Sequence, residues 1–100
     1  MMTDQISATI LKPPSAERFH AIDIAAWLAE GETITARTVE ASDPALQIDR
    51  ISTPAGLVRW RVRGGVAGQD YLVTVTITTN LERKEPVFIR YRVRQPAIAS

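Results

Sequence analysis

Residues 68–79 read Gly-Gln-Asp-Tyr-Leu-Val-Thr-Val-Thr-Ile-Thr-Thr, and this stretch decides the fold class. A glycine opens a short corner, and after the tyrosine aliphatic side chains alternate with threonine. Such period-two alternation of β-branched residues is typical of a strand with one buried face. It predicts a strand over residues 71–79 whose inward face is formed by Tyr71, Val73, Val75 and Ile77.

Two neighbouring runs follow the same rule, and each adds a row of arginines on its outer face. The run at 57–63 is predicted to bury Val58, Trp60 and Val62 beneath Arg59, Arg61 and Arg63. The run at 87–94 is predicted to bury Val87, Ile89, Tyr91 and Val93 beneath Phe88, Arg90, Arg92 and Arg94.

Three earlier runs are also strand candidates, at 17–23, 32–40 and 46–52, of which 32–40 is rich in β-forming residues and 46–52 is the weaker one. In the second, Ile34 and Ala36 are expected to point inward. In the third, one face is expected to hold Leu46, Ile48 and Arg50. Turn-forming residues separate the runs, and there is no room for the crossover helices that a parallel sheet needs. The pattern therefore predicts an all-β antiparallel sandwich or barrel.

The tyrosine after the glycine-rich corner favours an immunoglobulin-like antiparallel β-sandwich. In such domains a tyrosine at this place hydrogen-bonds back to the preceding loop and fixes the passage between sheets. Residues 57–63 then belong to one sheet and residues 71–79 and 87–94 to the other, with the arginine rows on opposite outer faces. The alternative is a simple hairpin that joins 57–63 to 71–79 in one sheet.

Two further elements are expected outside the strands. Residues 1–16 contain the pair Pro13-Pro14 and are interpreted as an extended N-terminal arm, which either packs along the domain or reaches a neighbour. Residues 17–100 then form the sandwich domain. Within it, apolar residues at helical spacing predict a short helical turn near residues 24–29, which covers one end of the core.

Composition excludes several classes of function. The 100 residues are 45% hydrophobic and 23% charged, which is ordinary for one folded domain. There is no cysteine, and His20 is the single histidine, so we expect no metal site, no cofactor and no catalytic centre. There is no apolar run long enough to span a membrane and no signal-like N-terminus. We therefore expect a product that stays in a cytoplasm or is built into something assembled there.

The two arginine rows are the most prominent surface feature. Residues 1–56 carry four basic and eight acidic residues, giving −4, whereas residues 57–100 carry eight basic and three acidic residues, giving +5. The rows can serve solubility, a protein interface paired with carboxylates of a neighbouring copy, or nucleic acid, which a net charge of +1 disfavours. The candidate interface residues are Arg59, Arg61, Arg63, Phe88, Arg90, Arg92 and Arg94.

The chain also resembles a known family over residues 10–94. The segments that carry the resemblance are Glu17-Arg18-Phe19, Asp23, Trp27-Leu28, Gly31-Glu32-Thr33-Ile34 and Gly68-Gln69-Asp70-Tyr71. They are similar to small tailed-bacteriophage structural proteins of the fibre-tail adaptor or neck-tail accessory type, although Ile24 stands where an aromatic residue is expected.

The resemblance implies a virion component of the tail or neck. Such a protein multiplies around a symmetric structure, as a ring, and joins other phage structural proteins, with no active site and no cofactor. The alternative function is an immunoglobulin-like module that binds a ligand such as a carbohydrate, for which Phe88 is the candidate aromatic platform.

Overall fold

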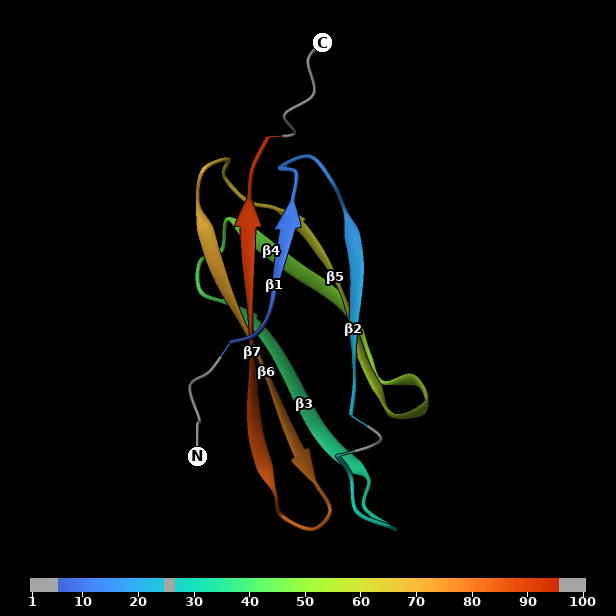
Figure 1. Ribbon diagram of the computed structural model, residues 1–100. Helices are drawn as coiled ribbons and strands as arrows, with labels where there is room; N and C mark the ends of the chain where they lie inside the picture. The colour runs from blue at the N-terminus through green and yellow to red at the C-terminus, as the bar shows by residue number, and fades with distance from the viewer. Residues whose placement is uncertain (1–5, 25–26, 96–100) are drawn as a thin grey trace.

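A computed structural model describes residues 6–24 and 27–95. This part of the chain is built almost wholly from strands, with one short 3-10 turn (Figure 1). The elements are β1 (Ile6–Lys12), β2 (Arg18–Asp23), β3 (Ile34–Ala41), β4 (Leu46–Ser52), η1 (Pro54–Gly56), β5 (Leu57–Gly64), β6 (Asp70–Thr79) and β7 (Lys84–Val93).

The strands form two sheets, which confirms the predicted all-β, immunoglobulin-like sandwich. Sheet A has the order β1-β7-β6-β3, and sheet B has the order β2-β5-β4. Strand β5 lies in one sheet, and β6 and β7 lie in the other. The alternative of a single hairpin from β5 to β6 is therefore wrong.

The core forms where the alternating faces of the two sheets meet. Each side chain predicted to point inward from β5 and β6 is at most 5% exposed, and Trp60 is fully buried between its valine neighbours. The inward face of β7 is buried in the same way except at Val87, which is partly exposed. The buried apolar residues are Ile24, Val39, Leu46, Val58, Trp60, Val62, Tyr71, Val73, Val75, Ile77, Ile89, Tyr91 and Val93.

The tyrosine corner is present. The Tyr71 hydroxyl accepts a hydrogen bond from the Val66 N–H at 2.8 Å, so the start of β6 is tied to the loop before it. In that loop Gly65 has a φ of 94°, and a Cβ there would lie 2.7 Å from a methyl group of Val93. Only glycine fits this close approach of the loop to β7.

Two strands depart from strict alternation, and two predicted inward positions are wrong for that reason. In β3 the register shifts between Ile34 and Ala36, so Ala36 is exposed. In β4 the register shifts between Asp49 and Ser52, and Arg50 adopts a left-handed φ of 53°. An irregularity of this kind re-aims the following side chains. Arg50 therefore faces solvent.

The expected N-terminal arm is extended, and its described part packs along the domain. Residues 6–12 form β1, which pairs in parallel with β7 as an edge strand of sheet A. Figure 1 shows β1 beside the upper half of β7, while the lower half of β7 continues beyond it. Strand β1 is therefore part of sheet A.

The expected helical turn near residues 24–29 is reduced to hydrogen bonds around one carbonyl. The N–H groups of Trp27 and Leu28 both donate to the Ile24 carbonyl, at 3.0 and 3.2 Å. Residues 25–26 lie outside the described residues. Ile24 is buried and Trp27 packs on the core, so this segment covers one end of the sandwich.

Candidate functional site

Two of the three arginines of β5, Arg61 and Arg63, form ion pairs within the fold. Arg61 holds Asp49 with two hydrogen bonds, of 2.8 and 2.7 Å, and Arg63 lies 3.2 Å from the same carboxylate. The hydrogen bonds from Arg61 keep the pKa of Asp49 below its usual value. Arg59, the exposed member of the row, lies over the Phe19 ring at 4.2 Å.

In the second arginine row, the contacts within the fold decrease from Arg94 through Arg92 to Arg90. Arg94 bonds Asp70 at 2.8 Å and also donates to two backbone carbonyls. Arg92 is half exposed and lies 3.7 Å from Asp70. Arg90 is exposed and has no ion pair with any residue that the structure describes. A guanidinium without a partner is available for a carboxylate from outside.

Apolar side chains lie beside Arg90 and Arg92 on the outer face of sheet A. Phe88 is half-buried there, next to Arg90 on the same strand face. Leu11 of β1 is 65% exposed and lies opposite Arg92. An arginine-rich surface with exposed apolar groups suits contact with another protein.

The two phenylalanines do not form a shared platform for a carbohydrate. Phe88 faces outward from sheet A, whereas Phe19, which is 45% exposed, lies on sheet B beneath Arg59. The two phenylalanines thus belong to different sheets and cannot line one sugar-binding surface.

The two arginine rows lie on different sheets, as predicted, but the structure does not bring all seven candidate residues together. Phe88, Arg90 and Arg92 form one surface, which we call the sheet A face. Arg59 stands apart on sheet B, and the other three arginines hold internal carboxylates.

Glu32 is the centre of a buried network that the sequence pattern did not reveal. Its carboxylate side chain is fully buried and accepts hydrogen bonds from Arg83, from the Thr79 hydroxyl and from the Ala29 N–H. These bonds, led by Arg83, lower its pKa to about 2. Arg83 also stacks over the Trp27 ring at 3.9 Å. The Trp-Leu and Gly-Glu-Thr-Ile segments are thus joined by one guanidinium.

Lys12 is fully buried at the end of β1. Its ammonium donates to the carbonyls of Pro13, Pro14 and Gly64, at 2.8, 3.3 and 2.7 Å. Burial is the main cause that lowers its pKa. All three donors are satisfied, so Lys12 connects the end of β1 to the end of β5 and has no donor left for a ligand.

His20 has a structural environment and no partner typical of catalysis. Its Nδ1 lies 2.8 Å from the Tyr91 hydroxyl, which itself accepts from the Trp60 indole N–H at 3.1 Å. Burial, followed by the charge of Arg18, lowers the pKa of His20. In residues 6–24 and 27–95 there is also no cluster of three acidic, histidine or cysteine side chains that could hold a metal.

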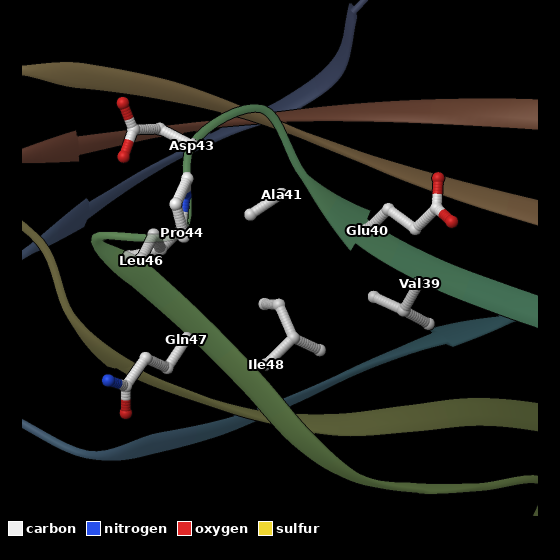
Figure 2. Close-up of a pocket in the computed structure, with 8 residues that line it drawn as sticks. All are labelled: Val39, Glu40, Ala41, Asp43, Pro44, Leu46, Gln47 and Ile48. Atoms are coloured by element: carbon white, nitrogen blue, oxygen red, sulfur yellow. The ribbon is translucent and has the colours of Figure 1, made fainter.

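One surface hollow lies between β3 of sheet A and β4 of sheet B. This β3–β4 groove has a volume of about 470 Å³. Figure 2 shows Val39 and Ile48 pointing toward the space between the strands, while the carboxylates of Glu40 and Asp43 point outward. The groove thus has an apolar floor and an acidic rim, without a basic residue in its lining.

A second hollow, of about 400 Å³, is more apolar and lies between β2 and the lower half of β7. It is lined by Ile22, Asp23, Ile24, Trp27, Ile77, Glu85, Pro86 and Val87. Across the described part of the chain, no helix is long and apolar enough to cross a membrane.

A solved structure shares this fold. The solution structure of the PKD domain from the KIAA 1837 protein superposes with a TM-score of 0.56 at 11% identity, covering 96% of this chain and 87% of that one. At this identity the likeness shows the fold alone. No curated protein matches the chain. A family described as podophage GP4 fiber-tail adaptor protein gp77 matches residues 12–90. Because this match spans most of the sandwich, the chain belongs to the podophage fibre-tail adaptor family.

Proposed function

We propose that the chain is a non-enzymatic structural protein of a phage virion that links tail or neck components, for example by attaching fibres. The family match over residues 12–90 supports this role. In this proposal the protein is assembled into the particle in the bacterial host cytoplasm, and its partners are other phage structural proteins, with neither nucleic acid nor a membrane among them.

The proposal assigns docking to the sheet A face. The observation that carries this assignment is the exposed Arg90, which lacks an internal ion pair in the described residues while Arg61, Arg63 and Arg94 have one. Arg90, the neighbouring Arg92 and the half-buried Phe88 offer an acidic partner both bidentate pairing and apolar contact.

Copies of the chain are proposed to form a homo-oligomer, in the form of a ring. An adaptor that serves a rotationally symmetric tail must present the same face several times. Contacts between unlike sides of identical subunits generate such a ring when the rotation closes.

The docking proposal is tested with the purified chain and the tail and fibre proteins of the same particle. The binding of each protein is measured by native mass spectrometry and by titration calorimetry. We expect Arg90→Glu to weaken binding roughly tenfold, because it places a like charge opposite the partner's carboxylates.

Arg59→Glu is the matched control, since it makes the same charge change at an exposed arginine on sheet B. It should leave the affinity within about twofold of the unmodified protein. Equal losses from both variants would remove the assignment to the sheet A face. Absence of binding to any tail component would overturn the adaptor role itself.

A further inference from the structure

The two edge strands of sheet A, β1 and β3, each have one register shift near their first residue and pair regularly beyond it. An exposed strand edge tends to pair with another chain unless a bulge, proline or charge prevents it. On sheet B, β4 is bent by its register shift and by the left-handed Arg50. On β7, the lower half that β1 leaves uncovered contains Pro86, which has no N–H to donate.

In strand β1 the register shift lies at the start, between Ile6 and Ala8, and the strand pairs regularly from Ala8 to Lys12. Its sequence, Ile-Ser-Ala-Thr-Ile-Leu-Lys, contains no proline, and its single charge, Lys12, is buried. On this strand Leu11 is 65% exposed, so a contact at this edge would remove a large apolar side chain from water.

The upper half of β3 is equally open. The Arg37 side chain turns inward and donates a hydrogen bond to the Ile51 carbonyl at 3.2 Å. This side chain occupies the lower half of the β3 edge. Above it, residues 38–41 pair regularly with β6. The Ser42 N–H donates to the Leu72 carbonyl at 2.8 Å, so by alternation the backbone groups of Val39 and Ala41 face away from β6. Those groups border the β3–β4 groove.

The chemistry of the two edges is complementary. At the β3 edge, the exposed Glu40 and Asp43 form the acidic rim of the groove. At the β1 edge, Thr9 lies opposite Arg90 on β7. Because threonine is small, the guanidinium of Arg90 can extend over Thr9 toward that edge.

The strand directions also allow the two edges to meet. Strand β1 is parallel to β7, and β3 and β7 are each antiparallel to β6. Strands β1 and β3 therefore run in the same direction at opposite edges of sheet A. Two copies related by a rotation that keeps the sheet direction can place β3 of one beside β1 of the next.

We infer that copies of this chain join head to tail by pairing β3 of one copy with β1 of the next, with Glu40 of the first copy facing Arg90 of the second. The contact extends sheet A from copy to copy and covers Leu11. This inference rests on the proposed oligomeric adaptor, and it names the surface through which the copies meet. It is a contact between unlike edges, so each copy uses its β3 edge for one neighbour and its β1 edge for the other.

Cysteine crosslinking tests the contact directly, because the chain contains no cysteine. Thr9 on β1 and Thr38 on β3 are both exposed. The double variant Thr9→Cys/Thr38→Cys is treated at increasing protein concentration with a short bifunctional thiol reagent and separated under denaturing conditions. We expect a ladder of covalent multimers, since every copy can be linked on both sides.

The single variants distinguish unlike edges from like edges. Neither Thr9→Cys nor Thr38→Cys alone should crosslink, because the inferred contact never places two identical edges together. Thr9→Cys/Gln47→Cys is the matched control, in which the second thiol lies on the exposed face of β4. Dimers from a single variant, an equal ladder from the control, or a double variant that stays monomeric up to millimolar concentration would each overturn the inference.

Charge exchange provides a second measurement, by sedimentation. Glu40→Arg and Arg90→Glu should each reduce self-association, and the combined variant should restore it, because the pair is re-formed with its signs reversed. Failure of the combined variant to regain association contradicts the pairing of these two residues.

These experiments use the isolated chain without tail proteins. The crosslinking variants leave Arg90 unchanged, so the crosslinking result separates from the docking test at Arg90. A covalent ladder without binding to any tail protein keeps the edge contact and removes the adaptor function. Binding to tail proteins by a chain that never crosslinks keeps the adaptor and removes the edge contact.

Discussion

The Tyr91 hydroxyl connects three strands through two side-chain contacts. It accepts from the Trp60 indole N–H and lies 2.8 Å from Nδ1 of His20. Trp60 and His20 belong to sheet B, whereas Tyr91 belongs to sheet A. The lowered pKa of His20 favours the neutral ring, so we assign the phenol proton to a hydrogen bond that Nδ1 accepts.

This assignment predicts a loss of stability below neutral pH. The pKa of His20 is lower in the folded chain than its ordinary value of 6.5, so the unfolded chain binds the proton more readily. The free energy of unfolding should therefore be highest well above pH 6.5 and should fall as the pH drops through 6.5 toward the folded pKa. Urea unfolding at half-unit pH intervals measures this slope.

His20→Gln is the control for the pH slope. Glutamine offers an oxygen to the Tyr91 hydroxyl but does not titrate, so the slope between pH 7 and 5.5 should flatten. Glu32 and Asp49 act in a lower pH range, because their lowered pKa values cost stability only below about pH 5. An unchanged slope in the variant would assign the effect to other groups.

Glu32 has a structural role that could not be predicted from the sequence. The segment Gly31-Glu32-Thr33-Ile34 was noticeable as a pattern, but its role depends on Arg83, which lies 51 positions later. No local rule links these two residues. Their meeting requires the turn after β6 to fold back beneath the Trp27 segment, and only the three-dimensional structure shows that.

Among the structural elements, the corner before β6 and the buried end of β7 each depend on one tyrosine hydroxyl. Tyr71→Phe removes the acceptor for the Val66 N–H, but Val66 is exposed and water can replace the bond. We expect a cost of about 1 kcal/mol. Tyr91→Phe leaves the indole N–H of the fully buried Trp60 without its acceptor, so the cost should be larger, about 1–3 kcal/mol.

Differential scanning calorimetry of the two tyrosine variants checks this order. Each 1 kcal/mol corresponds to a fall in Tm of roughly 4–8 °C in a domain of this size. Because both substitutions delete one hydroxyl from a buried ring, each variant is the control for the other. A larger fall in Tm for Tyr71→Phe would show that the corner contributes more than the inter-sheet hydrogen bond.

The strands that alternate regularly could be predicted from sequence, and the bent strands could not. In β5 and β6, every second side chain is aliphatic or aromatic, and each of these is buried as expected. In β3 and β4, one register shift each re-aims the side chains, so Ala36 and Arg50 point to solvent. The sequence carries no glycine at either shift, which is the usual signal of such an irregularity.

The candidate site shows the same limit. Alternation correctly located both arginine rows, but it cannot tell which guanidinium finds a carboxylate. Asp49 lies on β4 opposite Arg61, so pairing between strands decides the use of that row. Arg90 lies opposite Leu72 and has no such neighbour.

For the whole molecule, acidic residues at the β3 edge and Arg90 near the β1 edge of sheet A predict salt-dependent self-association. Raising NaCl from about 10 mM to about 1 M shortens the Debye length from about 30 Å to about 3 Å. Attraction between the rim of the β3–β4 groove and Arg90 of the next copy is thereby screened. Sedimentation velocity should show smaller assemblies at high salt.

The Arg59→Glu variant should show the same dependence on salt as the unmodified chain, because Arg59 lies on the other sheet. Self-association that strengthens with salt would indicate a contact dominated by apolar burial rather than by these charges.

The parallel pairing of β1 with β7 has a consequence for synthesis. The two strands are separated by nearly the whole chain, so β1 has no partner until residues 88–93 have left the ribosome. Until then the nascent protein lacks the finished four-stranded sheet, and one of its two joining edges does not yet exist. In the inferred contact between copies, the β1 edge is therefore completed only after β7 has been made, so the topology of sheet A delays self-association during synthesis.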